Sequence, residues 1–185
     1  MAPVAHLLLS WTSCVEFLKN RRERTIVALS GIAPDIDGLG VIIDKLTGTT
    51  SYFLKFHHYI GHSIFAAVIF STVACAIASS QRKTVWVFSF IVVHLHIICD
   101  VLGSKGPDGY HWPVYYLYPI NSEFQLNWRH QWELNAWPNQ VIVLLLFVVT
   151  IYYAATRRIT FLEIFSTRLN AEACSMHQKY VHKNY

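Results

Sequence analysis

The stretch KTVWVFSFIVVHLHIICDVLG, residues Lys83–Gly103, decides how this sequence folds. It reaches the roughly 20 predominantly apolar residues that an α-helix needs to cross the hydrocarbon core of a bilayer. The same stretch carries His94, His96 and Asp100. An ionisable side chain at membrane depth is costly unless it is paired or bound to an ion, so such side chains mark functional sites. The stretch therefore predicts a membrane helix that also carries chemistry.

Four further segments have the apolar character of membrane helices. The clearest is VIVLLLFVVTIYYAA, Val141–Ala155, which reaches membrane length together with its Trp137 flank. Tyr59–Ser79 is another, whereas Pro3–Leu18 is short and Thr25–Ile43 is interrupted by the sequence APDIDG. Together these segments predict an all-α, polytopic membrane bundle of about five membrane segments.

The composition favours the same class. Hydrophobic residues make up 54% of the 185 residues and charged residues only 14%, and the mean hydropathy is +0.33. This balance is typical of a membrane bundle rather than of an ordinary soluble domain. The length suits one domain, which we place at residues 1–156, with a tail at residues 157–185. The connection Ser104–Asn139 is rich in Trp, Tyr and Pro, and we expect it to form an aromatic outer loop at headgroup level.

Charge and cysteine content exclude other classes. Fifteen Lys and Arg residues against eleven Asp and Glu give a net charge of +4. The positive charges fall in short clusters and build no long basic face, so we expect no nucleic-acid partner. The cysteines are scattered and form no CxxC pair, which argues against a disulfide framework or a thiolate zinc site.

The positive clusters predict an orientation in the membrane. They lie at residues 19–24 (KNRRER), 82–83 and 157–158. Because Lys and Arg accumulate on the cytoplasmic side, five crossings place the N-terminus outside and the C-terminal tail in the cytoplasm. Most of the His and Asp residues then concentrate toward the outer, non-cytoplasmic half of an integral membrane protein.

His96 and Asp100 form the first candidate ligand pair. They lie four residues apart in HIICD, so both side chains leave the same face of a helix and can bind one cation. A histidine that only donates a hydrogen bond to an aspartate is the alternative for this pair. His94 points to another side of the helix, where it would support the ligands or pack in the core.

A second candidate pair lies in the sequence PDID. Pro34 cannot donate a hydrogen bond within a helix, and the freed backbone turns Asp35 and Asp37 inward, where two carboxylates can bind metal. Two carboxylates this close repel each other without a cation. The alternative is a simple helix-capping turn, with Asp37 before Gly38.

Histidines complete the predicted ligand set. His57 and His62 are five residues apart across a loop-to-helix junction and can converge, whereas we expect His58 to face elsewhere. Together with His6 and the two candidate pairs above, these histidines offer enough nitrogen and oxygen ligand atoms for two or more divalent ions. Histidine and carboxylate without thiolate suit zinc, manganese or iron. The predicted ligands are His6, Asp35, Asp37, His57, His62, His96 and Asp100.

Three outer residues are candidates for substrate contact. Lys105 and Arg129 are cations that can hold a phosphate, and His111 can close the site from the aromatic loop. The alternatives are solvated surface charges for the two cations and an ordinary interfacial position for His111.

The order H…PDID…HHYIGHS…HLHIICD…G…YP resembles the predicted membrane-bound metal-dependent hydrolases of the YdjM type. The resemblance covers roughly residues 3 to 120. The resemblance implies that the seven predicted ligands hold the metal. His58, Tyr59 and Gly61 depart from the family pattern, which has Arg, Gly and Thr at these positions. The order is also similar, more loosely, to that of the zinc-dependent phospholipase C and single-strand nuclease superfamily, which suggests phosphorus as the electrophile.

These observations lead to a functional hypothesis. We expect a metal-dependent hydrolase in which metal-activated water cleaves a phosphoester of a lipid or lipid-like substrate, with Asp37 and Asp100 in catalysis. A membrane metal-binding protein or an ion or proton transporter would use the same residues, with ligands at several depths. A purely structural bundle with coincidental histidines is the third reading.

Overall fold

The computed structural model describes residues 1–106 and 109–182, and this part of the chain is helical without a named strand. The elements, in chain order, are α1 (Pro3–Cys14), α2 (Arg21–Ser30), the 3₁₀ helix η1 (Ala33–Leu39), α3 (Gly40–Thr47), α4 (Tyr52–Phe56), α5 (Ile64–Ile77), α6 (Arg82–Gly103), α7 (Trp137–Arg157), the 3₁₀ helix η2 (Phe161–Ile164) and α8 (Thr167–His182). The predicted all-α class is confirmed.

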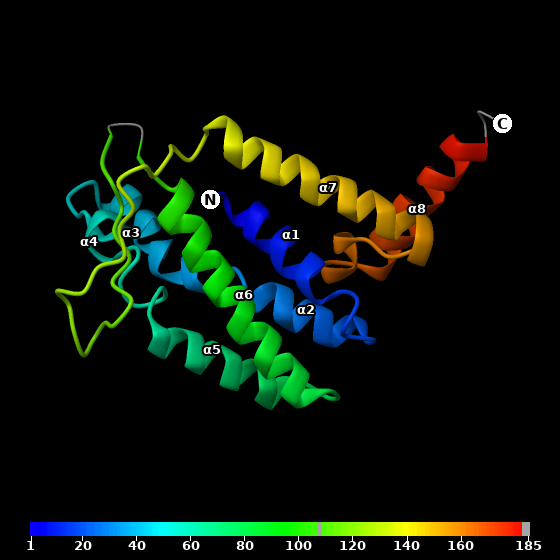
Figure 1. The fold of residues 1–185 in the computed structure, drawn as a ribbon, viewed down its shortest axis with the longest axis horizontal. Coiled ribbons are helices and arrows are strands. Elements are labelled where there is room, and N and C mark those ends of the chain that lie inside the picture. Colours follow the sequence, from blue (N-terminus) through cyan, green and yellow to red (C-terminus); the bar gives the residue numbers. More distant parts are fainter. Residues whose placement is uncertain (107–108, 183–185) are drawn as a thin grey trace.

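Five of these helices build a bundle around α1 and α6 (Figure 1). The closest helix pairs are α5 with α6, α1 with α2, α2 with α6, and α1 with α7. The start of α1, the end of α2 and the end of α6 meet at one end of the bundle, where His6, Gly31 and Asp100 approach one another. The start of α7 joins the same end, because the Asn139 side-chain amide donates to the carbonyl of Gly103.

Two helices are long and apolar enough to cross a membrane, α6 and α7. The count rises to three if α2 and the segment Ala33–Thr47, bent by 46° at their junction, form one broken span. The predicted break in Thr25–Ile43 is therefore present, but the prediction of about five spans is not supported. The first helix has only 12 residues and α5 has 14, and 14 residues extend about 21 Å against a hydrocarbon core of about 30 Å.

Capping and small residues explain the short, tightly packed α5. Ser63 caps this helix, since its hydroxyl accepts the Ala66 amide hydrogen at 3.1 Å, and the predicted segment Tyr59–Ser79 therefore loses its first turn to a loop. Buried Ala67 and Ala74 on α5 pack in the clusters that also contain Val92 and Val93 of α6. Small side chains let two membrane helices approach closely.

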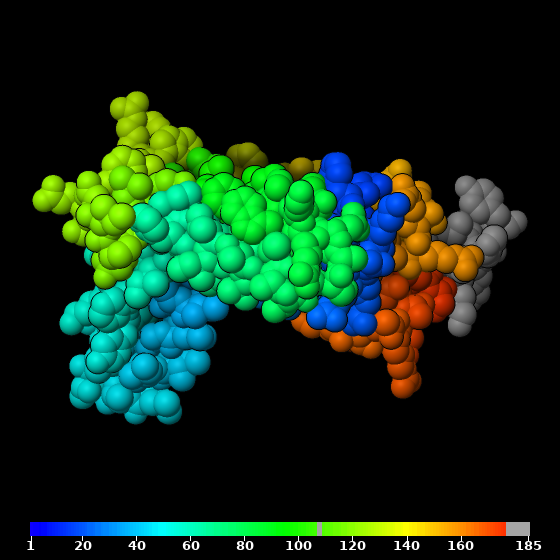
Figure 2. Space-filling model, turned by 90° about the horizontal axis from the view of Figure 1, so that it is seen from below, coloured from blue at the N-terminus to red at the C-terminus, as the bar shows by residue number. Residues whose placement is uncertain are grey.

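The helices η1, α3 and α4 form a projection at the end of the bundle where the loops gather (Figure 2). Asp44 fastens α4 to α3, because its carboxylate accepts the backbone amides of Tyr52 and Phe53 at 2.8 and 2.9 Å. Many apolar side chains of the projection are exposed, among them Ile36, Leu39, Ile42, Ile43, Leu46 and Leu54. A concentration of exposed apolar side chains in one segment is typical of contact with a membrane or a partner.

The opposite end of the bundle is fastened by a buried ion pair between Arg24 and Glu163. The Arg24 guanidinium donates to both oxygens of Glu163 at 2.6 Å, and the Trp11 indole donates to the same carboxylate at 2.8 Å. Ile164 of η2 joins the core cluster of α1, which contains Leu7 and Trp11. The segment after α7 is therefore packed against the bundle at η2.

We expect Glu163→Ala to destabilise the protein strongly, because it leaves the Arg24 guanidinium buried without its carboxylate partner. Removing one partner of a buried ion pair costs about 3–5 kcal/mol. The measurement is the free energy of unfolding, followed by circular dichroism during a denaturant titration of the detergent-solubilised protein. Glu172→Ala is the matched control, since it breaks an exposed pair with Arg168 and should change stability by less than about 1 kcal/mol. Equal effects of the two variants would contradict this role of Glu163.

Candidate metal centre

Four side chains from three parts of the chain converge on one point at the loop-rich end of the bundle. Each offers one ligand atom, and these atoms all lie within 4.8 Å of one another. They come from η1, from the loop before α5 and from the last turns of α6, and the four residues are Asp35, His62, His96 and Asp100. This cluster, called the metal centre below, could hold a metal ion. All four residues belong to the set predicted from the sequence.

Backbone and carboxylate partners fix the two imidazoles of the metal centre. The His96 Nδ1–H donates to the carbonyl of Gly31 at 2.7 Å, and the His62 Nδ1–H donates to Asp37 Oδ2 at 3.0 Å. The Nε2 atoms of both rings therefore face each other at 3.1 Å, and each presents a lone pair when it carries no proton. Asp100 Oδ2 lies 3.0 Å from the His96 Nε2 and 3.3 Å from the His62 Nε2. Buried acceptors this close repel one another unless a proton or a metal cation lies between them.

The spacing of these acceptors fits a metal ion. The His96 Nε2 is 3.0 Å from Asp100 Oδ2 and 3.6 Å from Asp35 Oδ1. Neighbouring ligands around a tetrahedral ion with bonds of about 2.1 Å lie about 3.4 Å apart. Asp35 Oδ2 is buried and has no hydrogen-bond partner among the described residues. The donor set of imidazole nitrogen and carboxylate oxygen suits zinc, manganese or iron.

Asp37 lies behind the metal centre and orients its histidines. Its Oδ1 accepts from the His57 Nδ1 at 2.8 Å, and its Oδ2 accepts from His62 and from the Gly61 amide at 3.1 Å. Burial disfavours a charged His62, but hydrogen bonds to Asp100 and Asp37 outweigh it and raise the pKa of the imidazole to about 9. The surroundings of His62 therefore attract a cation. Carboxylates that hold the second nitrogen of a ligating histidine are common at metal sites.

His6 and His58 flank Asp100 on its other sides. The His6 Nε2 is 3.3 Å from Asp100 Oδ1, and the His6 ring stacks on His96 with centroids 3.7 Å apart. The His58 Nε2 is 3.8 Å from Asp100 Oδ2, and the Met1 amino group also contacts Asp100. Burial and the neighbouring His62 hold the pKa of His58 well below its usual value, so its ring is neutral. If the protein binds two or more ions, as predicted, His6 and His58 are the further side chains beside Asp100 that could bind the second one.

Close backbone contacts position these groups. A Cβ on Gly31 would lie 1.7 Å from the Ser10 Oγ, and one on Gly61 would lie 2.2 Å from the carbonyl oxygen of Pro34. Only glycine permits these approaches. The first brings the carbonyl of Gly31 to His96, and the second holds the loop before α5 against η1.

A pocket of about 520 Å³ opens onto the metal centre. Its polar wall contains Asp35, His57, His58, Asp100 and Lys105, and its apolar wall includes Leu39, Phe53, Trp112 and Leu134. A mostly apolar cavity with a few convergent polar groups is the usual form of a small-molecule site.

The predicted substrate residues take different positions. Lys105 lines this pocket. His111 is half-buried in the aromatic loop with its Nδ1 unpaired among the described residues, and it is not among the residues that line the pocket. Arg129 is exposed and donates to the neighbouring His130 at 2.9 Å. The roles of all three residues stay predictions, as do the roles of His6, Asp37 and His57 as ligands.

His58 is a residue of the site that the sequence analysis did not predict. It was expected to face elsewhere, yet it is 1% exposed and lies beside Asp100. The reason is its backbone, whose φ of 71° turns the chain between His57 and Tyr59. Histidine is one of the residues enriched in this left-handed region, but no turn residue beside it signals the conformation.

These features define a class, an α-helical protein with membrane-length helices and a His and Asp cluster that could hold a metal ion. The model of the YdjM inner membrane protein family matches residues 1–171. The chain therefore belongs to this family of inner membrane proteins, in agreement with the resemblance noted from its motifs. Neither a curated protein nor a solved structure matches the chain.

We expect Asp37→Asn to lower metal affinity about 10- to 100-fold, because an orienting carboxylate behind a ligating histidine has effects of this size. The measurement is a zinc titration of the purified protein, with bound metal counted by mass spectrometry. Asp44→Asn is the matched control, since Asp44 binds only backbone and Thr50 groups of the projection. Unchanged affinity in Asp37→Asn would refute the orienting role.

We also expect His96→Ala to abolish metal binding and His94→Ala to preserve it. The two residues lie on the same helix, but His94 contacts the Phe90 carbonyl and the Tyr116 hydroxyl instead of the metal centre. The same metal count on both purified variants tests this difference. A stoichiometric ion in His96→Ala would show that the metal lies elsewhere.

Proposed function

We propose that this protein is a membrane-bound, metal-dependent hydrolase that cleaves a phosphoester of a lipid or lipid-like substrate. The observation that carries the proposal is the cluster of nitrogen and oxygen ligand atoms of Asp35, His62, His96 and Asp100, three of them from buried residues, at the wall of an apolar pocket that also contains a lysine. A bound divalent ion would supply activated water and neutralise charge on a phosphoryl oxygen. Asp35, His62, His96 and Asp100 would hold the first ion.

The residues of the pocket have distinct roles in this proposal. The Lys105 ammonium binds a non-bridging phosphoryl oxygen, and the apolar wall excludes bulk water from the reacting ester. Water adds to phosphorus, the ester P–O bond breaks, and the leaving oxygen takes up a proton as the alcohol. Neutral His58, in the pocket wall 3.8 Å from Asp100, accepts the proton of the attacking water. Asp37 keeps both of its oxygens on His57, His62 and Gly61, which supports an orienting role.

The alternative of an ion or proton transporter requires ligands at several depths. In the part of the chain that the structure describes, one group of His and Asp residues with metal-ligand spacing is present, and it lies at one end of the bundle. This placement supports a fixed catalytic centre. The basic clusters at residues 19–24, 82–83 and 157–158 lie at the other end, which supports a site that faces away from the cytoplasm.

The test is hydrolysis by the purified protein in detergent or proteoliposomes, screened over lipid phosphates and phospholipids with and without chelator. We expect chelator-sensitive phosphoester hydrolysis, lost in His96→Ala and in Asp100→Asn with helix content unchanged. Turnover that survives in both variants would disprove the assignment. Metal or proton flux across sealed proteoliposomes, without any hydrolysis, would favour the transporter.

We expect Lys105→Ala to raise KM about tenfold and lower kcat less, because a lysine that binds a substrate phosphate contributes on the order of 1–2 kcal/mol. The measurement is steady-state kinetics on the best lipid phosphate. Lys45→Ala removes an exposed lysine of α3 and should leave both constants unchanged. An equal effect of the two substitutions would mean that Lys105 acts through general charge attraction.

A further inference from the structure

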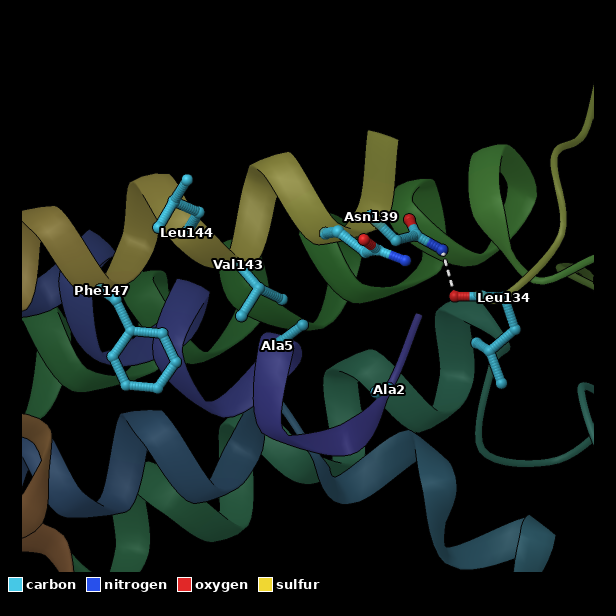
Figure 3. Close-up of a pocket in the computed structure, with 8 residues that line it drawn as sticks. Ala2, Ala5, Leu134, Asn139, Val143, Leu144 and Phe147 are labelled. Atoms are coloured by element: carbon cyan, nitrogen blue, oxygen red, sulfur yellow. Dashed lines mark hydrogen bonds between the residues drawn. The ribbon is translucent and has the colours of Figure 1, made fainter. Parts of the chain in front are cut away.

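A second pocket, of about 380 Å³, lies between the start of α1 and the first turns of α7 (Figure 3). Ala5, Val143 and Phe147 point into it from the two helices, and Leu134 closes one end. Leu144 and Phe147 are 63% and 39% exposed, so the pocket is open to the surface of the protein along α7. The small side chain of Ala5 leaves the space that the pocket occupies.

The polar groups in the wall of this pocket are already engaged. The Asn139 amide donates to the carbonyls of Gly103 and Leu134 at 2.9 and 2.8 Å, and its oxygen accepts from the Trp132 indole. The Gln140 amide donates to the Asn135 carbonyl at 2.9 Å. A ligand of the pocket therefore meets apolar surface and few free donors, which suits a hydrocarbon.

This pocket adjoins the one that opens onto the metal centre. Leu134 lines both pockets. The first residues of the chain separate them, since Met1 and Pro3 line the pocket of the metal centre whereas Ala2 and Ala5 line the apolar one. A molecule with a polar head in one pocket and an apolar tail in the other would contact Leu134, which both pockets share.

We propose that the pocket between α1 and α7 binds one hydrocarbon chain of the substrate while the phosphate group lies beside Lys105 and the metal centre. This inference rests on the proposed function and adds the substrate class, a phosphate ester with a long alkyl or acyl chain. The chain enters sideways from the bilayer along α7, so the substrate does not leave the membrane.

A photolabelling experiment tests the binding site without requiring turnover. The probe is a single-chain alkyl phosphonate that carries a diazirine in the middle of its chain, used on the full-length protein in detergent. We expect labels at residues 2–5 and 143–147, displaced by excess unlabelled alkyl phosphonate and not by the alcohol of equal chain length. Val143→Trp should remove these labels, and Leu145→Trp, a change at an exposed position of the same helix, should leave them.

Kinetics provides the second arm, through the ratio of kcat/KM for a long-chain and a short-chain phosphate ester. We expect Val143→Trp to lower this ratio at least tenfold and Leu145→Trp to leave it unchanged. Labels spread evenly along α7, labels displaced equally by the alcohol, or a ratio unaffected by Val143→Trp would overturn the inference. Specific labels without chelator-sensitive hydrolysis would instead refute the proposed function and leave a lipid-phosphate binding site.

Discussion

Mutual repulsion among buried hydrogen-bond acceptors is the constraint on which this structure depends. His62 and His96 both turn their Nε2 atoms toward Asp100 because other groups occupy their second nitrogens. The carbonyl of Gly31 fixes one ring and the carboxylate of Asp37 fixes the other. These contacts tie the end of α2 to α6 and η1 to the loop before α5, so the arrangement that creates the need for a cation also assembles this end of the bundle. A cation at this point would stabilise the folded state together with the site.

Much of the site could be predicted from the sequence because its chemistry is local. The spacing of His96 and Asp100 places them on one face of a helix, and Pro34 explains the turn that carries Asp35. The number of spans could not be predicted by the same means. Apolar composition does not reveal where a helix ends, and α1 ends at Cys14 while α5 starts only after Ser63. His58 could not be predicted as a site residue for a related reason, because a single left-handed backbone conformation sets the direction of its side chain.

The two ends of the bundle differ in what holds them together. At one end, Arg24 and Glu163 form a buried ion pair through two hydrogen bonds, Trp11 donates a further hydrogen bond to Glu163, and Arg24 also donates to the carbonyls of Leu18 and Lys19. At the other end, His6 and His58 keep buried nitrogens without hydrogen-bond partners among the described residues. Unsatisfied buried groups cost stability and persist where function requires them. The ion pair therefore contributes stability at the end of the bundle away from the metal centre.

The projection of η1, α3 and α4 carries part of the metal centre beside exposed apolar side chains. Asp35 and Asp37 lie on η1, whose neighbouring residues Ile36 and Leu39 are exposed and apolar. Leu39 also lines the pocket that opens onto the metal centre. A membrane or partner surface that covered this part of η1 would therefore act on the short helix that carries two carboxylates of the site. Metal affinity in detergent and in a bilayer would then differ.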